Sequence, residues 1–272
     1  MEFGNWNLEF EFNMDLFYHK IFNFKSKVLD NFFDLIFPKR CLHCQKFLEN
    51  KNQIYLCQDC LKEIKLNSSL FCPICKKRLF ILKFKNSKKL KISRCYHQEK
   101  SYLYALGAAT NFSSQIISEI IYTYKYQLVK ELSNLIASLI FIYLEKTSLL
   151  EFFSQKKFLC LAVPLSRKKE YFRGFNQTAL FGKKLSQKLN LEFDQEILIQ
   201  IKPTKDQTKL NFNQRKENVK GVFKILKKEK IKGKNIILFD DVYTTGATMN
   251  EIARLLKEGG AKKIIGIVFA LN

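Results

Sequence analysis

Apolar and polar positions follow two alternating patterns from residue 102 to the end of the chain. Short apolar runs are typical of buried strands, and between them apolar residues recur every three or four positions, as on one face of a helix. The predicted strands cover residues 105–110, 158–163, 197–201, 235–239 and 263–269. The predicted helices cover residues 113–145 (one helix or two), 177–189 and 249–258. Gly259 and Gly260 suit the end of the last helix. This order predicts an α/β domain built on a parallel sheet.

The first hundred residues follow a different pattern. Residues 1–36 predict an N-terminal extension with an amphipathic helix, whose aromatic face suits contact with the rest of the protein better than with a membrane. Residues 37–100 hold closely spaced cysteine pairs, and residues 101–272 hold the α/β pattern. We therefore expect a helical extension, a cysteine-rich module and an α/β domain.

Length and composition fit this division. A chain of 272 residues, 47% of them hydrophobic, is long enough for one sizeable α/β domain and a small accessory domain. The N-terminus carries acidic residues where a secretory signal needs basic ones, and the longest apolar window, residues 135–144, is too short to span a bilayer. We therefore expect a cytoplasmic protein, in which paired cysteines indicate metal ligands more than disulfides.

The formal net charge is +22. Such an excess suits a polyanionic partner such as nucleic acid, a phosphorylated metabolite or an anionic membrane face. The chain is also rich in Lys, Asn, Ile and Phe, a bias that AT-rich coding produces by itself. The charge therefore permits a nucleic-acid partner without identifying one.

Seven of the eight cysteines lie between Cys41 and Cys95. Each C-x2-C pair places two thiolates on one tight turn, and two such pairs supply the tetrahedral sulfur set that Zn²⁺ favours. The first predicted zinc site takes its ligands in chain order, from Cys41, Cys44, Cys57 and Cys60. A closed site of four thiolates has no open position for catalysis, so we expect it to be structural.

A second zinc site is predicted from Cys72, Cys75, Cys95 and His97. The C-x-H spacing of its last two members is unusual, and an exposed His97 is the alternative. A pairing in which the first and third cysteine pairs share a metal also stays open at this point. Cys160 lies alone in an apolar run and is predicted to be a small core residue.

Residues 76–91 carry eight basic residues and no acidic one, with Phe80 and Phe84 among them. Positive charge interleaved with aromatic rings is the combination with which proteins bind single-stranded nucleic acid. The alternative is a solvated ribbon loop.

Residues 235–249 carry the most specific pattern in the chain. An apolar strand ends in two adjacent carboxylates, Asp240 and Asp241, and is followed by a turn and an amphipathic helix. The turn consists of Thr244, Thr245, Gly246, Ala247 and Thr248. Backbone N–H groups and hydroxyls at the start of a helix favour a phosphate. The neighbouring carboxylates suit vicinal hydroxyls on the same sugar. The simpler reading, an ordinary strand followed by a threonine-capped helix, does not explain this order. The segment resembles the 5-phosphoribosyl-1-pyrophosphate (PRPP) loop of type I phosphoribosyltransferases.

Two further segments are predicted near this turn. Residues 164–177 form a basic loop after a strand, where open α/β sheets bind ligands, and Arg173 followed by Gly174 suits a pyrophosphate. Residues 202–234, with twelve basic and three acidic residues, are predicted to form a long loop that covers the site.

The order of these parts resembles the ComF family of competence and phosphoribosyltransferase-like proteins. The resemblance rests on F-P-x-x-C before the cysteine pairs, T-Y-K-Y, V-P-L with R-G-F-N-Q, R-x-x-N-V-x-G-x-F and D-D-V-x-T-T-G-A-T, and covers residues 37–270. It implies a type I phosphoribosyltransferase fold joined to a zinc ribbon, and a role in DNA uptake during natural transformation. It also implies contact with single-stranded DNA and with the competence helicase.

The resemblance also implies the roles of individual residues. Asp240 and Asp241 hold the ribose hydroxyls and orient Mg²⁺, and they are the candidate catalytic pair. The turn of Thr244, Thr245, Gly246, Ala247 and Thr248 holds the 5′-phosphate, Arg173 faces the pyrophosphate, and Lys125 is a further candidate for that anion. Purine-salvage members place an acidic general base shortly after the acid pair, and this chain has Thr244 there.

Three functions follow as hypotheses. The first is a competence-type protein that binds PRPP with Mg²⁺ and single-stranded DNA. The second is an active phosphoribosyltransferase that releases pyrophosphate from PRPP onto an unidentified acceptor. The third is a PRPP-sensing regulator without DNA contact. Whether the chain catalyses a reaction does not follow from its sequence.

Overall fold

A seven-stranded mixed sheet forms the centre of the computed structural model, which describes residues 39–48, 55–84, 87–204 and 212–272. The strand order is β2-β1-β5-β11-β10-β6-β7. The five strands from β5 to β7 are parallel, and β1 and β2 are antiparallel. The bounds are β1 Leu70–Phe71, β2 Arg78–Leu79, β5 Ala105–Asn111, β6 Phe158–Ala162, β7 Glu192–Phe193, β10 Asn235–Tyr243 and β11 Ile264–Leu271.

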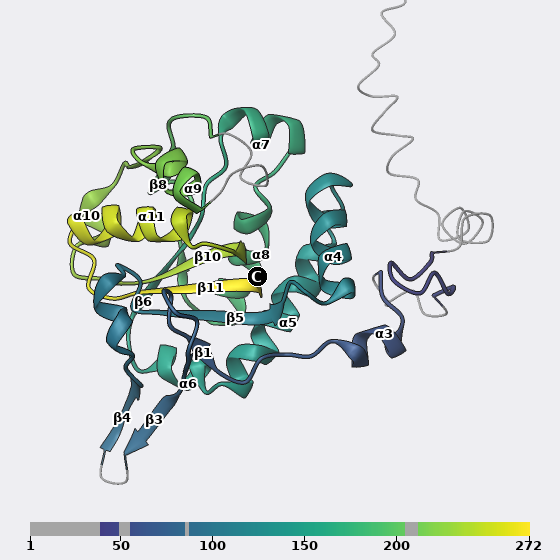
Figure 1. The fold of residues 1–272 in the computed structure, drawn as a ribbon, viewed down its shortest axis with the longest axis horizontal. Coiled ribbons are helices and arrows are strands. Elements are labelled where there is room, and N and C mark those ends of the chain that lie inside the picture. The colour runs from purple at the N-terminus through teal and green to yellow at the C-terminus, as the bar shows by residue number, and fades with distance from the viewer. Residues whose placement is uncertain (1–38, 49–54, 85–86, 205–211) are drawn as a thin grey trace, which may run out of the picture.

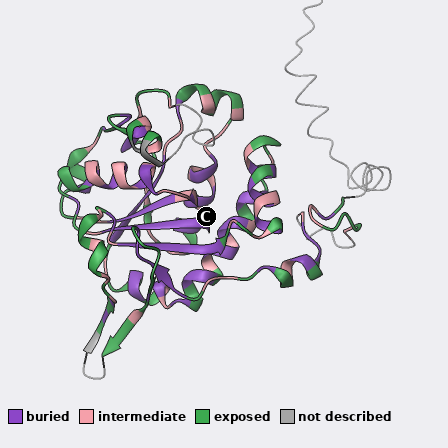
Figure 2. Cartoon of the chain, in the orientation of Figure 1, coloured by how far each residue is buried: buried purple, intermediate pink, exposed green. Residues whose placement is uncertain are grey.

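Helices cover both faces of the sheet, since alternate residues of each central strand point to opposite sides. In β11, Ile265, Ile267 and Phe269 join one core cluster, and Ile264 and Val268 join the other. The first face carries α4 Gln115–Tyr126, α5 Leu132–Lys146, α6 Leu149–Ser154 and α8 Gln177–Lys188. The second carries α9 Phe212–Val219, α10 Lys228–Ile231, α11 Ala247–Glu258 and the strand pair β8 Leu198–Gln200 and β9 Phe223–Ile225. The strands are accordingly buried between the two layers (Figure 2).

The remaining elements lie at the edges. α3 Gln58–Glu63 belongs to the cysteine module, and a 3-10 helix covers Tyr96–Lys100. The hairpin of β3 Ile81–Phe84 and β4 Ser87–Ile92 projects from the sheet (Figure 1). α7 Arg167–Arg173 lies between β6 and α8. Within the described ranges, every helix is too short or too polar to cross a membrane.

Most predicted elements are present, and residues 113–145 form two helices. The predicted loop at 164–177 is wrong over seven residues, where α7 forms. Its start is capped by Ser166, whose Oγ accepts a hydrogen bond from the Lys169 N–H over 3.3 Å. Its end is Gly174, at a φ of 69° that favours glycine. The sequence pattern missed this helix because none of its residues is buried, so it lacks the apolar face by which a helix is recognised.

The long loop predicted over residues 202–234 is also wrong where the structure describes it. α9, β9 and α10 occupy much of that segment, and β9 pairs with β8. Val219, Val222 and Ile231 are buried beneath α11, so this segment completes the second core. The helix predicted in residues 1–36 and the loop residues 205–211 lie outside the described residues.

Candidate functional site

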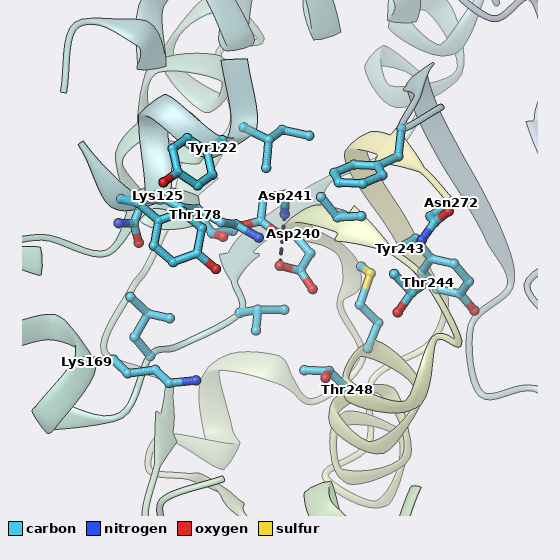
Figure 3. Close-up of a pocket in the computed structure, with 18 of the residues that line it drawn as sticks. Tyr122, Lys125, Lys169, Thr178, Asp240, Asp241, Tyr243, Thr244, Thr248 and Asn272 are labelled. Carbon is cyan, nitrogen blue, oxygen red and sulfur yellow. Dashed lines mark hydrogen bonds and ion pairs between the residues drawn. The ribbon is translucent and has the colours of Figure 1, made fainter. Parts of the chain in front are cut away.

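A pocket of about 1060 Å³ lies at the carboxyl ends of the central strands. Its walls include residues at or just after the ends of β5, β6, β10 and β11, together with residues of α4 and α7 and the start of α11 (Figure 3). All nine residues predicted to bind PRPP line it: Lys125, Arg173, Asp240, Asp241, Thr244, Thr245, Gly246, Ala247 and Thr248. These nine residues come from three separate segments of the chain, which thus meet where parallel α/β sheets bind ligands.

The two carboxylates lie at the end of β10, which continues past them to Tyr243 because Asp240 and Val242 still pair with β11. The Asp241 backbone N–H donates to Asp240 Oδ1 over 2.9 Å. Burial, followed by the negative charge of Asp241, raises the pKa of Asp240 to about 8. Two adjacent carboxylates that cannot both ionise freely are suited to share a cation.

Lys125 of α4 forms an ion pair with Asp241, with Nζ 2.8 Å from Oδ2 and both side chains largely buried. The sequence made this lysine a further candidate for the pyrophosphate, and in the structure it pairs with one of the predicted metal-orienting acids. The ion pair lies inside the pocket, not beneath it, and Asp240 keeps partial exposure (Figure 3). A bound cation would therefore contact Asp241, and a bound anion would contact Lys125.

The turn after β10 is held in one shape by Gly246. Its φ is 75°, and a Cβ at this position would clash with the hydroxyl of Tyr243. That hydroxyl is fixed, because it donates to the Pro73 carbonyl over 2.8 Å. Gly246 is the N-cap residue of α11 and has no side chain to cap the helix, and the Ala247 N–H donates to Thr245 Oγ1 over 3.4 Å. The start of α11 lines the pocket, so the positive end of the helix dipole lies there. This is the geometry of a phosphate cradle.

Arg173 ends α7 at the opposite wall. Its guanidinium lies 5.7 Å from the ring centroid of Tyr126, and Nη1 donates to Gln177 Oε1 over 3.1 Å. Gln177 is almost fully buried, and its Nε2 has no hydrogen-bond partner among the residues that the structure describes. A buried donor left unsatisfied costs about 1–3 kcal/mol, and Gln177 is one of the residues that line the pocket. An acceptor brought by a ligand would relieve this cost.

Sequence reasoning missed several residues of the pocket: Leu42, Gln45, Tyr122 and Thr178. Lys169 and Arg215, which also line it, belong to the predicted basic loop and to the predicted covering loop. Arg215 was present in the quoted R-x-x-N-V pattern, and its Nη1 donates to Thr244 Oγ1 over 3.3 Å. Tyr122 lies one helical turn before Tyr126, with the ring centroids 5.1 Å apart, so the α4 spacing carried a signal for it. No sequence signal indicated that Leu42 and Gln45 come to the pocket from the cysteine module.

The cysteines form two clusters. The sulfurs of Cys41, Cys44, Cys57 and Cys60 lie within 4.8 Å of one another, and so do those of Cys72, Cys75 and Cys95. This grouping follows chain order. The interleaved alternative, in which the first and third cysteine pairs share a metal, is therefore wrong. Four converging thiols fit Zn²⁺, and the module is a zinc-binding one. His97 Nδ1 lies 3.7 Å from Cys95 Sγ, and its role as fourth ligand stays a prediction. Cys160 is fully buried in β6, as expected.

Comparison with known families supports both parts of the chain. Residues 32–96 match a double zinc ribbon domain, and residues 177–272 match a phosphoribosyl transferase domain. The chain therefore has a phosphoribosyltransferase-type α/β sheet joined to an N-terminal zinc ribbon. The predicted boundaries at residues 36 and 100 stay predictions.

Three relatives from bacteria are informative. Competence protein F of Haemophilus influenzae is 28% identical, over 86% of this chain and 96% of its own. Competence protein ComFC of Bacillus subtilis is 32% identical, over 40% of this chain and 42% of its own. DNA utilization protein YhgH of Escherichia coli is 36% identical, over 38% and 45%, so the chain spans less than half the length of that relative. With the two domain matches, these similarities support the resemblance to the ComF family that the sequence motifs indicate.

Proposed function

We propose that the pocket binds PRPP together with Mg²⁺. The observation that carries this proposal is the meeting, in one pocket, of the acid pair of β10 with the uncapped start of α11. Asp240 and Asp241 suit the ribose hydroxyls and the metal, and the turn from Thr244 to Thr248 suits the 5′-phosphate.

The rest of the pocket suits the pyrophosphate. Lys125 and Arg173 supply positive charge, and Gln177 Nε2 supplies a donor without an acceptor. Mg²⁺ binds through one or two carboxylates plus substrate phosphates, which fits an acid pair beside a phosphate cradle. When bound, the metal would supply charge that neutralises the pyrophosphate.

We further propose that the protein acts in DNA uptake or DNA utilization in the cytoplasm and binds single-stranded DNA. This role comes from the names of its relatives, Competence protein F and DNA utilization protein YhgH. Support within the chain is the net charge of +22 and the basic hairpin segment with Phe80 and Phe84. Contact with a competence helicase stays a prediction from the family resemblance.

An active phosphoribosyltransferase is the second candidate, favoured by the intact acid pair and by the size of the pocket. The acidic residues among the pocket's described lining are Glu119, Asp240 and Asp241. Glu119 is engaged, with Oε2 2.9 Å from His43 Nδ1 and Oε1 accepting from Gln115. Because this leaves no free general base among them, we place PRPP binding ahead of transfer to an acceptor that must lose a proton.

Calorimetric titration with PRPP and Mg²⁺ tests the proposal. The double variant Asp240→Asn/Asp241→Asn should lose measurable binding, because neither side chain can then charge-pair with the metal. The matched control Glu145→Gln/Glu229→Gln removes the same charge from exposed helix positions and should bind like the wild type. Equal affinity in the acid-pair variant would refute the site. Release of pyrophosphate with any nucleobase, amine or DNA end would establish the second candidate.

A further inference from the structure

A second groove, of about 810 Å³, lies at the amino ends of the parallel strands. Tyr104 and Lys263, in its walls, directly precede β5 and β11, and Lys156 lies two residues before β6. The other walls come from β4 and from the end of α6. β11 is eight residues long, so the groove is about 25 Å from the PRPP pocket at the opposite edge of the sheet.

The charge of this groove has one sign. Its described lining residues include no acidic one. They include five basic ones: Lys89, Lys91, Arg94, Lys156 and Lys263. Glu151 of α6 is directed elsewhere, since its Oε2 pairs with Lys83 of β3 over 2.6 Å. Such a surface favours an anionic ligand.

Two of these lysines are half-buried against aromatic rings. Lys263 Nζ lies 4.3 Å from the centroid of Tyr104, and Lys156 Nζ lies 4.7 Å from that of Phe152. Burial lowers the pKa of Lys263, and Arg94 and Lys91 lower it further. Burial likewise lowers the pKa of Lys156, with further contributions from Lys263 and Lys89. The groove therefore holds its amines close together and partly dehydrated. A chain of phosphates would reduce the repulsion between these positive charges.

The hairpin wall is fixed and carries exposed rings. The Leu90 N–H donates to Gln155 Oε1 of α6 over 2.9 Å, which joins β4 to the body of the domain. Phe80 and Phe84 are about half exposed. Lys91 Nζ lies 5.5 Å from the Phe84 centroid, so the ring stands beside the groove. Exposed rings beside a basic groove suit unpaired bases, whereas a duplex keeps its bases stacked internally.

From these observations we infer that the groove binds the sugar-phosphate backbone of single-stranded nucleic acid, with bases stacked on Phe80 and Phe84 of the hairpin segment. The inference rests on the proposed function and adds where the strand lies. Five cations from several segments exceed what one phosphate group needs, which favours a chain of phosphates. The strand would then lie at the edge of the sheet opposite the PRPP pocket, so both ligands bind at once.

Fluorescence anisotropy with a labelled 15-residue oligothymidylate, measured on the full chain, tests the inference. The variant Lys156→Gln/Lys263→Gln should bind at least tenfold more weakly. Its slope of log K against log salt should be smaller by about 1.4, from two lost contacts at about 0.7 each. The matched control Lys183→Gln/Lys228→Gln removes two exposed charges from α8 and α10 and should stay within twofold of the wild type. PRPP affinity should be unchanged in both variants.

The outcomes separate the inference from the proposed function. If the wild type binds no oligonucleotide, the DNA part of the proposed function fails and the groove assignment fails with it. If the wild type binds and the groove variant binds equally, the groove assignment alone is overturned. Polyglutamate competing as well as the oligonucleotide, at equal charge, would overturn the nucleic-acid assignment.

A second measurement does not depend on a variant that folds. Photocrosslinking of the wild-type chain to an oligonucleotide carrying photoreactive thymines, followed by peptide mass spectrometry, locates the strand directly. Crosslinks on Phe80, Phe84 or Tyr104 support the groove. Crosslinks confined to other surfaces overturn it.

Discussion

The two edges of the central sheet bear opposite kinds of charge arrangement. At the carboxyl edge, Asp240 and Asp241 face Lys125 and Arg173 across one pocket, and an ion pair already joins Lys125 to Asp241. At the amino edge, the groove gathers lysines and an arginine without any acidic lining residue in its described part. The first arrangement suits a ligand that brings its own metal, and the second suits one that brings only negative charge.

The two ends of the same strands therefore suit different ligands, because different side chains surround each end. A mixed-charge pocket selects by geometry, since each acid and base must find its complement in the ligand. A groove of one sign attracts any polyanion and selects by the rings beside it. This contrast leads to predictions that test each edge separately.

The largest expected effect is that of magnesium. Omitting Mg²⁺ at constant ionic strength should weaken PRPP binding roughly a hundredfold, about 2.7 kcal/mol, because the pyrophosphate then loses the cation that neutralises its charge. Oligonucleotide binding should stay within twofold, because the described lining of the groove includes no carboxylate to carry a metal. Calorimetry for PRPP and anisotropy for the oligonucleotide measure the two. Metal-independent PRPP binding would contradict the role of the acid pair.

The second-largest expected effect is that of replacing Gly246 in the turn by alanine. Alanine there takes a left-handed conformation and clashes with the Tyr243 hydroxyl, which Pro73 holds in place. We expect a loss of about 2–3 kcal/mol in the free energy of unfolding, and PRPP affinity lower by at least tenfold. Denaturant unfolding and calorimetry measure both. Oligonucleotide binding should persist at a temperature where the variant is folded.

Gly174→Ala is the control for that variant. Its φ is also positive, at 69°, but nothing lies within 4 Å of an added Cβ. The change should cost only about 1 kcal/mol, the ordinary penalty of the conformation. If both glycine variants behave alike, the Tyr243 contact does not hold the turn.

The third prediction concerns pH and Asp240. Its pKa is about 8 in the folded chain and near 3.9 in an unfolded one. The folded state thus binds the extra proton, so the stabilisation from Asp240 is fully present below the unfolded pKa and is lost as pH rises through about 8. Relative to the wild type, Asp240→Asn should therefore gain thermal stability between pH 6 and pH 9. Melting curves at the two pH values measure it.

Asp194 provides the matched control. Burial raises its pKa, but the hydrogen bond and charge of Lys230 outweigh burial and the net shift is downward. Asp194→Asn should therefore show no relative gain over the same range. A binding signature accompanies the Asp240 prediction: PRPP with Mg²⁺ should release a proton below pH 8, detectable as a dependence of the calorimetric heat on the buffer. Absence of both effects would mean that Asp240 is ionised in the free protein.

The sequence predicts the sheet and the pocket well because both depend on local order. The apolar run, the acid pair and the Thr-Gly turn are consecutive, so β10, the turn and α11 follow from a few residues. Arg173 was identified for the same reason, as part of a short motif. The prediction failed where burial depends on distant segments: the segment of α9, β9 and α10 looks like a basic loop, yet Val222 and Ile231 pack beneath α11.

Contacts between the zinc module and the pocket were not predictable either. His43, between two zinc ligands, pairs with Glu119 of α4, 76 residues later. Leu42 and Gln45 reach the pocket through the same contact. The groove at the other edge was also invisible in sequence, since Lys156 and Lys263 are 107 positions apart and only the sheet brings them together. Local motifs are visible in the sequence, whereas a pocket or groove whose walls come from separate segments can be recognised only once the fold is known.

The smallest expected effect tests the unsatisfied donor of Gln177. Gln177→Met keeps the side-chain length and removes Nε2, which has no partner in the free protein, and Oε1, which accepts from Arg173. The gain from removing a buried unsatisfied donor and the loss of one charged hydrogen bond are each on the order of 1–3 kcal/mol. The melting temperature should therefore change little. PRPP affinity should fall about fivefold to tenfold, because a donor to the pyrophosphate is lost. Gln187→Met, exposed on the same helix, should bind PRPP like the wild type. If Gln177→Met also binds like the wild type, Nε2 faces no ligand atom, and the pyrophosphate must lie nearer Lys125 than Arg173.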